Sequence, residues 1–280
     1  MLEDSDKVFE QMLTACAENP NACNLAQNRT AEELIDYAYQ WFEDLKTNPV
    51  VLSLPTGDGF IVTYSLARTV LHTALYSPAA WPGITSLFQS VVDGDAGGVI
   101  SFIWSQTGTV PVDAEAQYGI KCGDVWDPQD DKEAVREIQE ARSNASRAFG
   151  DALDILPAVC AQWTLKAREQ YTGDFSVNTS TPIFLIGNKL DPVTPLASAF
   201  EMSSGFGGSV VLEHGGTGHS VTSTQASRCT VDAIRAYFAD GTLPTPGTTC
   251  EVEELEFGAI GWPALLAEMP AQCPVALPNA

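Results

Sequence analysis

Basic residues are scarce in this sequence. Only 14 lysines and arginines stand against 36 aspartates and glutamates in 280 residues, which gives a formal net charge of −22. Such a negative field repels phosphate groups, so we expect neither a nucleic acid nor an anionic membrane surface as a partner. An ordinary role for this acidity is solubility in an acidic external medium.

Long hydrophobic stretches are also lacking. No run approaches the ~20 apolar residues that a membrane-spanning helix needs, and the acidic residues 1–6 lack the apolar segment of a signal peptide. Seven cysteines and three glycosylation sequons nevertheless indicate an extracellular protein. We therefore expect the full-length protein to be secreted, with its export signal in a segment that this chain lacks. The sequons are Asn28-Arg29-Thr30, Asn144-Ala145-Ser146 and Asn178-Thr179-Ser180.

Motifs for metals and cofactors are absent. There is no Cys-x-x-Cys pair, and His72 does not cluster with thiols. His214 and His219 form a His-x4-His pair, but glycines separate them and no carboxylate has the spacing found in zinc proteases. The same glycines lack the Gly-Lys-Ser/Thr ending of a phosphate-binding loop. We therefore expect no metal and no cofactor.

Six of the seven cysteines can be paired by position, although sequence alone does not fix their connectivity. One pair closes a small loop, one joins two helical regions, and one brackets a helix and a Gly/Pro-rich turn. The leftover Cys273 is either a free buried thiol or the partner of a cysteine in absent sequence. The hypothesis pairs Cys16 with Cys23, Cys122 with Cys160, and Cys229 with Cys250.

The first half of the sequence is expected to be largely helical. Thr30 and Glu33 have the spacing of a capping box, and apolar residues then recur along one face as far as Leu45. The Pro- and Gly-containing stretch 49–59 breaks this helix. Further helical patterns cover residues 66–75, 84–91 (ending near Gly94) and 131–171 (interrupted near Pro157).

The pattern changes near residue 180 to that of an α/β protein. Residues 181–187 and 209–213 are short apolar runs, typical of strands buried on both faces of a parallel sheet. Residues 195–202 predict a helix between them, and this order implies parallel pairing. Another helix is expected over about 226–239. Because two strands do not form a stable sheet alone, we expect N-terminal core strands that are absent from this chain.

Two side chains suited to acid–base chemistry follow the predicted strands. Asp191 lies in the loop after the first strand, and His219 lies after the second, in a Gly-rich loop that begins at His214. Ligands of parallel sheets bind at the carboxyl ends of strands, and an acid followed by a histidine is the later part of the α/β-hydrolase order. Taken separately, each residue is more often only a turn or tight-bend residue. Their joint placement after consecutive buried strands favours a catalytic pair.

Several motifs together resemble those of the tripeptidyl-aminopeptidase-like (TAP-like) α/β-hydrolases, which are related to prolyl aminopeptidases. In the second half these are residues 181–187, Leu190-Asp191-Pro192-Val193-Thr194-Pro195, Gly216-Thr217-Gly218-His219-Ser220, Ser227-Arg228-Cys229, residues 237–244 and Cys250-Glu251. In the first half, three motifs are similar to the cap of the same family: Leu75-Tyr76-Ser77-Pro78 with Trp81-Pro82, residues 119–124, and Cys160-Ala161-Gln162-Trp163.

The resemblance implies an α/β-hydrolase core with a helical cap inserted before the acid-bearing strand. It divides the chain into a cap (1–178), the C-terminal part of the core (179–260) and a tail (261–280). It also implies a secreted serine peptidase acting on peptide N-termini, or a related esterase, with a peptide or small ester as substrate. In such an enzyme Asp191 is the triad acid and His219 the general base. Asp124 is a candidate contact for the substrate amino terminus, or simply a helix or turn carboxylate.

The sequence departs from this family in one decisive respect. The Gly-x-Ser-x-Gly motif that carries the nucleophile does not occur here, and an acid and a base without a nucleophile cannot form an acyl-enzyme. Three interpretations stay open: a fragment whose missing N-terminal core segment supplies the serine, a non-catalytic binding protein, or an enzyme of another class using Asp191 and His219 with a metal or a partner chain. We expect the chain alone to be inactive.

Overall fold

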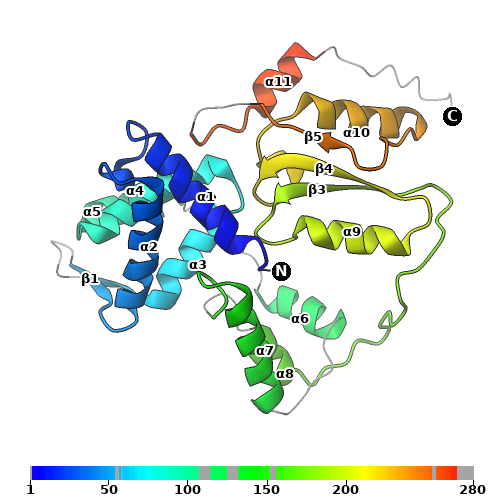
Figure 1. Ribbon diagram of the computed structural model, residues 1–280. Coiled ribbons are helices and arrows are strands. Elements are labelled where there is room, and N and C mark those ends of the chain that lie inside the picture. The colour runs from blue at the N-terminus through cyan, green and yellow to red at the C-terminus, as the bar shows by residue number, and fades with distance from the viewer. Residues whose placement is uncertain are drawn as a thin grey trace.

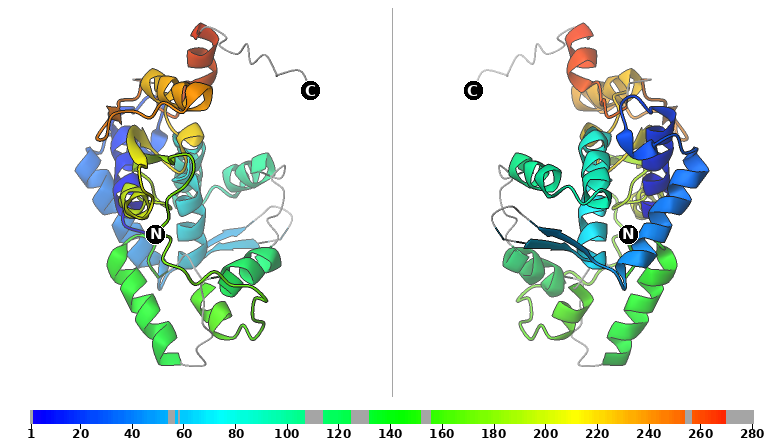
Figure 2. Two further views of the ribbon diagram at one scale, coloured as in Figure 1. Left: turned by 90° about the vertical axis from the view of Figure 1, so that its right-hand side faces the viewer. Right: turned by 90° about the vertical axis from the view of Figure 1, so that its left-hand side faces the viewer.

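The computed structural model describes residues 2–53, 57, 59–106, 114–124, 132–151, 156–253 and 257–269. Helices make up most of the first half, and a parallel sheet with flanking helices makes up the second (Figure 1). The two side views show α7 at the opposite end of the molecule from α11 (Figure 2). The elements of the first half are α1 (Ser5–Glu18), η1 (Asn24–Ala26), α2 (Ala31–Leu45), β1 (Val50–Ser53), β2 (Gly59–Val62), α3 (Tyr64–Ala74), η2 (Pro78–Ala80), α4 (Trp81–Val92), α5 (Ala96–Gln106), α6 (Ala114–Asp124), α7 (Lys132–Ala145) and α8 (Leu156–Ala161). Those of the second half are β3 (Phe184–Leu190), α9 (Leu196–Gly205), β4 (Val210–Thr217), η3 (Val221–Ser223), α10 (Arg228–Asp240), β5 (Thr249–Cys250) and α11 (Trp262–Glu268).

The predicted helix ends are confirmed where their capping chemistry is strong. At the start of α2, the backbone N of Glu33 donates to Thr30 Oγ1 at 3.2 Å and the Thr30 backbone N donates to Glu33 Oε2 at 2.9 Å. This reciprocal capping box satisfies two amides that the helix itself leaves unpaired. α4 is followed by Gly94, whose φ of 71° lies in the left-handed region that glycine adopts readily.

The main hydrophobic core lies between α1, α2, α3 and α4. Phe9 of α1 packs its ring against Phe42 of α2 and against Phe149, with ring centres 5.6 and 5.5 Å apart. Leu190, at the end of β3, packs against this core from the second half. A second, smaller cluster brings the β1–β2 hairpin against α3, α4 and α5; its buried members are Leu45, Leu52, Val62, Ala67, Val91 and Val99.

Two parts of the first half differ from the prediction. The stretch 49–59 does more than end α2, because β1 and β2 on either side of residues 54–58 form an antiparallel hairpin. The helical pattern over 131–171 is wrong beyond Ala161, where no described residue up to 183 is helical. Residues 164–182 are exposed and have no buried apolar face, and short helices depend on such a face for their stability.

The second half contains the parallel sheet that the sequence predicts. β3 pairs with β4 in parallel, with Phe184 opposite Val210, and α9 connects them. Two details of the prediction are corrected. β4 extends to Thr217, so His214 lies within the strand rather than in the loop. β5 is a third parallel strand, which no apolar run in the sequence predicted.

The three disulfide bonds join the cysteines as hypothesised. The Cα–Cα distances are 5.2 Å for Cys16–Cys23, 5.1 Å for Cys122–Cys160 and 5.4 Å for Cys229–Cys250, all within the normal range. The last of these links the start of α10 to β5. Cys273 lies outside the described residues. Across the described part of the chain, no helix combines the length and apolar character needed to cross a bilayer.

Candidate active site

Asp191 directly follows β3 and is almost completely buried, with 2% of its surface exposed. Its Oδ1 accepts hydrogen bonds from the backbone N of Val193 and of Thr194, both at 2.8 Å. Its Oδ2 accepts one from Thr194 Oγ1 at 2.9 Å. This is the turn that an aspartate forms with the amides two and three residues on. The turn therefore holds the carboxylate in one orientation.

His219 follows β4 and faces this carboxylate. Its Nδ1 lies 3.2 Å from both Oδ1 and Oδ2 of Asp191. A carboxylate only accepts hydrogen bonds, so in the neutral imidazole the proton is on Nδ1. Nε2 then carries the lone pair and makes no hydrogen bond within the described part of the chain. This orientation, with no partner at Nε2 among the described residues, is the one that a histidine general base requires.

Tyr76, from the first half of the chain, contacts His219 because the Gly-rich loop before His219 can approach it closely. The His219 backbone N donates to the Tyr76 carbonyl at 2.8 Å, and the two rings pack edge to face with centres 5.1 Å apart. Gly218 has a φ of 128°, and a Cβ there would lie 2.7 Å from the Tyr76 carbonyl oxygen. A glycine is therefore required at this position.

α1 holds the same end of the sheet in place, beside the ends of β3 and β4 (Figure 1). Ser5 Oγ donates to the Pro192 carbonyl at 2.9 Å, in the loop that carries Asp191. Thr217, the last residue of β4, donates from Oγ1 to Gln11 Oε1 at 3.0 Å. Both strand ends are therefore tied to one helix, which restricts their relative movement.

An open hollow lies in front of the acid and the histidine. Its volume is about 390 Å³, and it is bounded by β3, α9 and the loop after β4. Asp191, Thr194 and His219 line it together with Asn188, whose Nδ2 donates to the Gly218 carbonyl at 2.8 Å. The hollow leaves room beside the histidine for a nucleophile and a substrate carbonyl.

The other two histidines are not part of this site. His214 is fully buried, with Nδ1 2.8 Å from Thr230 Oγ1 and Nε2 2.9 Å from the Gln225 carbonyl. Desolvation by burial lowers the pKa of His214, partly opposed by the hydrogen bond to Gln225. Burial also lowers the pKa of His72 to about 4, opposed by a hydrogen bond to the Pro192 carbonyl. Both imidazoles are therefore neutral near pH 7 and act as structural groups.

Asp124 is the last residue of α6 and is exposed, and its backbone carbonyl accepts a hydrogen bond from Gln170. Its suggested contact with substrate stays a prediction. In the described ranges, no three His, Cys, Asp or Glu side chains gather as metal ligands would.

Several contributors to the site were not predicted from the sequence, among them Thr194 and Tyr76. Thr194 and Tyr76 both lie inside motifs that carry the family resemblance, but the motifs alone assign neither residue a role. Thr194 follows Asp191 by three residues, the spacing of a local turn, and this signal was available. Tyr76 is 143 positions away from His219, and no local pattern connects them.

Known proteins similar to this chain support the family resemblance. Residues 146–250, which include Asp191 and His219, match the family model described as TAP-like protein. Carboxylesterase B from Mycobacterium tuberculosis strain CDC 1551 / Oshkosh and from strain ATCC 25618 / H37Rv are each 26% identical to this chain over 263 residues. The matches cover 86% of this chain and 46% of each relative, so the chain spans about half the length of these curated relatives. The resemblance to the TAP-like α/β-hydrolases that the motifs predicted is therefore confirmed.

Proposed function

We propose that this chain is the acid- and base-bearing half of a secreted serine hydrolase that cleaves carboxylic esters. The observation that carries the proposal is the geometry of Asp191 and His219, whose Nδ1 lies 3.2 Å from the carboxylate while Nε2 makes no described hydrogen bond. This is the arrangement that the later two members of a Ser-Asp-His triad require.

The reaction follows from these two groups and one serine. His219 Nε2 takes the proton of the serine hydroxyl as the oxygen bonds to the ester carbonyl carbon. The Asp191 carboxylate stabilises the imidazolium through Nδ1. The tetrahedral intermediate then expels the alcohol, which leaves with the proton from Nε2, and an acyl-enzyme remains. Water then attacks the acyl-enzyme in the same way, giving its proton to His219 Nε2. The serine leaves with that proton, and the carboxylic acid is released.

The serine is assigned to a core segment outside these 280 residues. The sequence has no Gly-x-Ser-x-Gly motif, and the match covers only 46% of the relative's length. Among the described residues, β3 is an edge of the three-stranded sheet. An unpaired edge readily accepts a further strand. In this proposal residues 1–178 form the cap, residues 179–260 complete the core after that segment, and the segment pairs with β3.

Substrate class and location are proposed on three grounds. The two relatives are named carboxylesterases, and the charge of −22 disfavours anionic substrates. The three disulfide bonds are typical of secreted proteins, and the asparagines of all three sequons are exposed. Removal of residues from peptide N-termini is the second candidate, favoured by the match to the TAP-like family model.

The experiment compares the protein as its source produces it with the 280-residue chain. The source protein should exceed 280 residues, hydrolyse p-nitrophenyl butyrate, and carry a fluorophosphonate label on one serine outside these residues. The chain alone should not be labelled. Faster cleavage of a tripeptidyl p-nitroanilide than of the ester would favour the peptidase.

Three results would contradict the proposal. Labelling of a serine within the chain, such as Ser220, would show that the nucleophile has been misplaced. A source protein of only 280 residues that is folded and resists the probe would favour a non-catalytic binding protein. Tightly bound stoichiometric metal would favour an enzyme of another class.

A further inference from the structure

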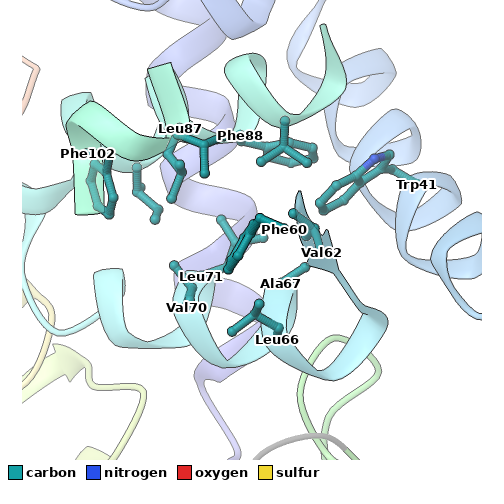
Figure 3. A pocket seen from close by; sticks show the side chains of 13 residues that line it. Trp41, Phe60, Val62, Leu66, Ala67, Val70, Leu71, Leu87, Phe88 and Phe102 are labelled. Atoms are coloured by element: carbon teal, nitrogen blue, oxygen red, sulfur yellow. The ribbon is translucent and has the colours of Figure 1, made fainter. Parts of the chain in front are cut away.

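The second hydrophobic cluster contains a cavity. Its volume is about 200 Å³, and it lies between the hairpin, α3, α4 and α5. In Figure 3 the lining side chains show carbon atoms only, apart from the indole nitrogen of Trp41. Protein interiors are normally packed with few voids larger than a water molecule, and an apolar cavity of ~150 Å³ stays dry and binds benzene. A cavity of this size and lining is suited to an apolar ligand.

The cavity is built by residues that face inward from regular elements. Along β2, Phe60 and Val62 line it while Ile61, between them, is 53% exposed on the outer face of the hairpin. α3 contributes Leu66 and Val70 at helical spacing. Phe60, Leu66 and Val70 are only partly buried, so the cavity opens to solvent along α3.

The lining defines the chemistry of the ligand. An ammonium, carboxylate or amide would lose its hydration, and the Trp41 indole N–H is the one hydrogen-bonding group among these lining side chains. A net charge of −22 further disfavours a free fatty acid anion. The volume equals roughly six or seven groups the size of a water molecule, each with a share of about 30 Å³ in the liquid. The cavity therefore fits the end of a neutral aliphatic chain of about that many carbons.

α3 leads from the cavity to the candidate active site. Val70 and Thr73 lie three residues apart in α3, which ends at Ala74, and Tyr76 follows in the turn after the helix. Thr73 and Tyr76 are exposed, and the Tyr76 ring packs against His219. We propose that the cavity binds the end of the acyl chain of a neutral long-chain ester, with the rest of the chain along α3 and the ester carbonyl at His219. This rests on the proposed esterase function.

The cavity is tested by binding alone, without hydrolysis. Isothermal titration calorimetry of the source protein carrying His219→Ala, which blocks hydrolysis and is the reference for the variants below, should be done with methyl esters from propionate to decanoate. Affinity should rise roughly fourfold per methylene, because each buried CH₂ contributes about 0.8 kcal/mol. The rise should stop at about six or seven carbons. Octanoate anion should bind more weakly than methyl octanoate.

Val70→Trp fills the cavity and should weaken methyl octanoate binding at least tenfold. Ile61→Trp, which adds the same side chain to the outer face, should bind within twofold of the wild type. Phe60→Ala enlarges the cavity and should move the plateau to longer chains, which tests the inference even if Val70→Trp does not fold. Circular dichroism checks the fold of each variant.

Affinity that does not depend on chain length, or a folded Val70→Trp that binds like the wild type, would overturn the inference. Esterase activity in the source protein that Val70→Trp leaves unchanged for long-chain esters would also overturn it, and the proposed function would survive. The expected binding series without any ester hydrolysis would support the cavity and refute the esterase.

Discussion

Two histidines lie only five residues apart on β4 and the loop after it, yet their surroundings are opposite. His214 is fully buried, and both ring nitrogens are within hydrogen-bond distance of Thr230, Thr224 or the Gln225 carbonyl. His219 is partly exposed, is held at Nδ1 by Asp191, and has no described partner at Nε2. The difference shows that a histidine can act as a base only if the fold leaves one of its ring nitrogens without a hydrogen-bond partner. The residue type alone does not decide this.

The largest expected effect is the loss of turnover when His219, but not His214, is replaced. In the full-length protein, His219→Ala should lower kcat about 10⁴- to 10⁶-fold, as when a triad member is removed, because the proposed mechanism uses His219 to accept the serine proton. The melting temperature should change little, since the ring is partly exposed. Thr222→Ala, an exposed change in the same loop, is the control for turnover of p-nitrophenyl butyrate. A His219→Ala enzyme with near-normal turnover would remove this residue from the mechanism.

His214→Ala should give the reverse result. The change leaves a cavity and unpaired groups at Thr230 and Gln225, and should cost about 2–4 kcal/mol of unfolding free energy in urea titrations. Turnover well below the melting temperature should remain close to that of the wild type. If stability is unchanged but turnover collapses, the division of roles between the two histidines is wrong.

His72, the third histidine, has its pKa lowered by burial, as His214 does, and this should make the stability of the fold depend on pH. The pKa of His72 is lowered from 6.5 to about 4 by burial, so the folded state holds the ring neutral and binds fewer protons than the unfolded chain. Its stabilising contribution is complete above pH 6.5 and is lost as the pH falls towards 4, by roughly 3 kcal/mol at 1.36 kcal/mol per pH unit.

Urea unfolding of the wild type and of His72→Gln between pH 7 and 4 isolates this contribution, because the carboxylates titrate alike in both. The difference in unfolding free energy between the two proteins should shrink or change sign as the pH falls. A difference independent of pH would mean that His72 titrates normally in the folded protein.

The smallest effect concerns Thr194, which donates to Asp191 Oδ2 at 2.9 Å and lies 3.3 Å from His219 Nδ1. Thr194→Val removes one hydrogen bond to the carboxylate and should lower kcat about tenfold or somewhat more, since a hydrogen bond to a charged group contributes about 1.5–3 kcal/mol. Thr194→Ser keeps the hydroxyl and should restore the rate. Equal loss in both variants would indicate packing rather than the hydrogen bond.

Much of the second half could be predicted because its signals are local. The apolar runs, the helix between them and the placement of Asp191 and His219 after consecutive strands all follow from residues that are close in sequence. β5 could not be predicted in this way, because a strand of two residues carries no periodicity. The β1–β2 hairpin was missed for a similar reason, because its strands are only four residues long. The Pro and Gly residues beside them predicted only the end of a helix.

The sequence by itself determined the capping box at Thr30 and Glu33, the parallel strand–helix–strand unit, and the pairing of an acid with a histidine. Each of these depends on short-range hydrogen bonding or periodicity, which neighbouring residues specify. Only the tertiary structure decided that Ser5 holds the loop of Asp191 across 187 positions, that Tyr76 holds His219, and that a cavity lies between the hairpin and α3. Such contacts depend on how distant surfaces pack, and no local pattern encodes that packing.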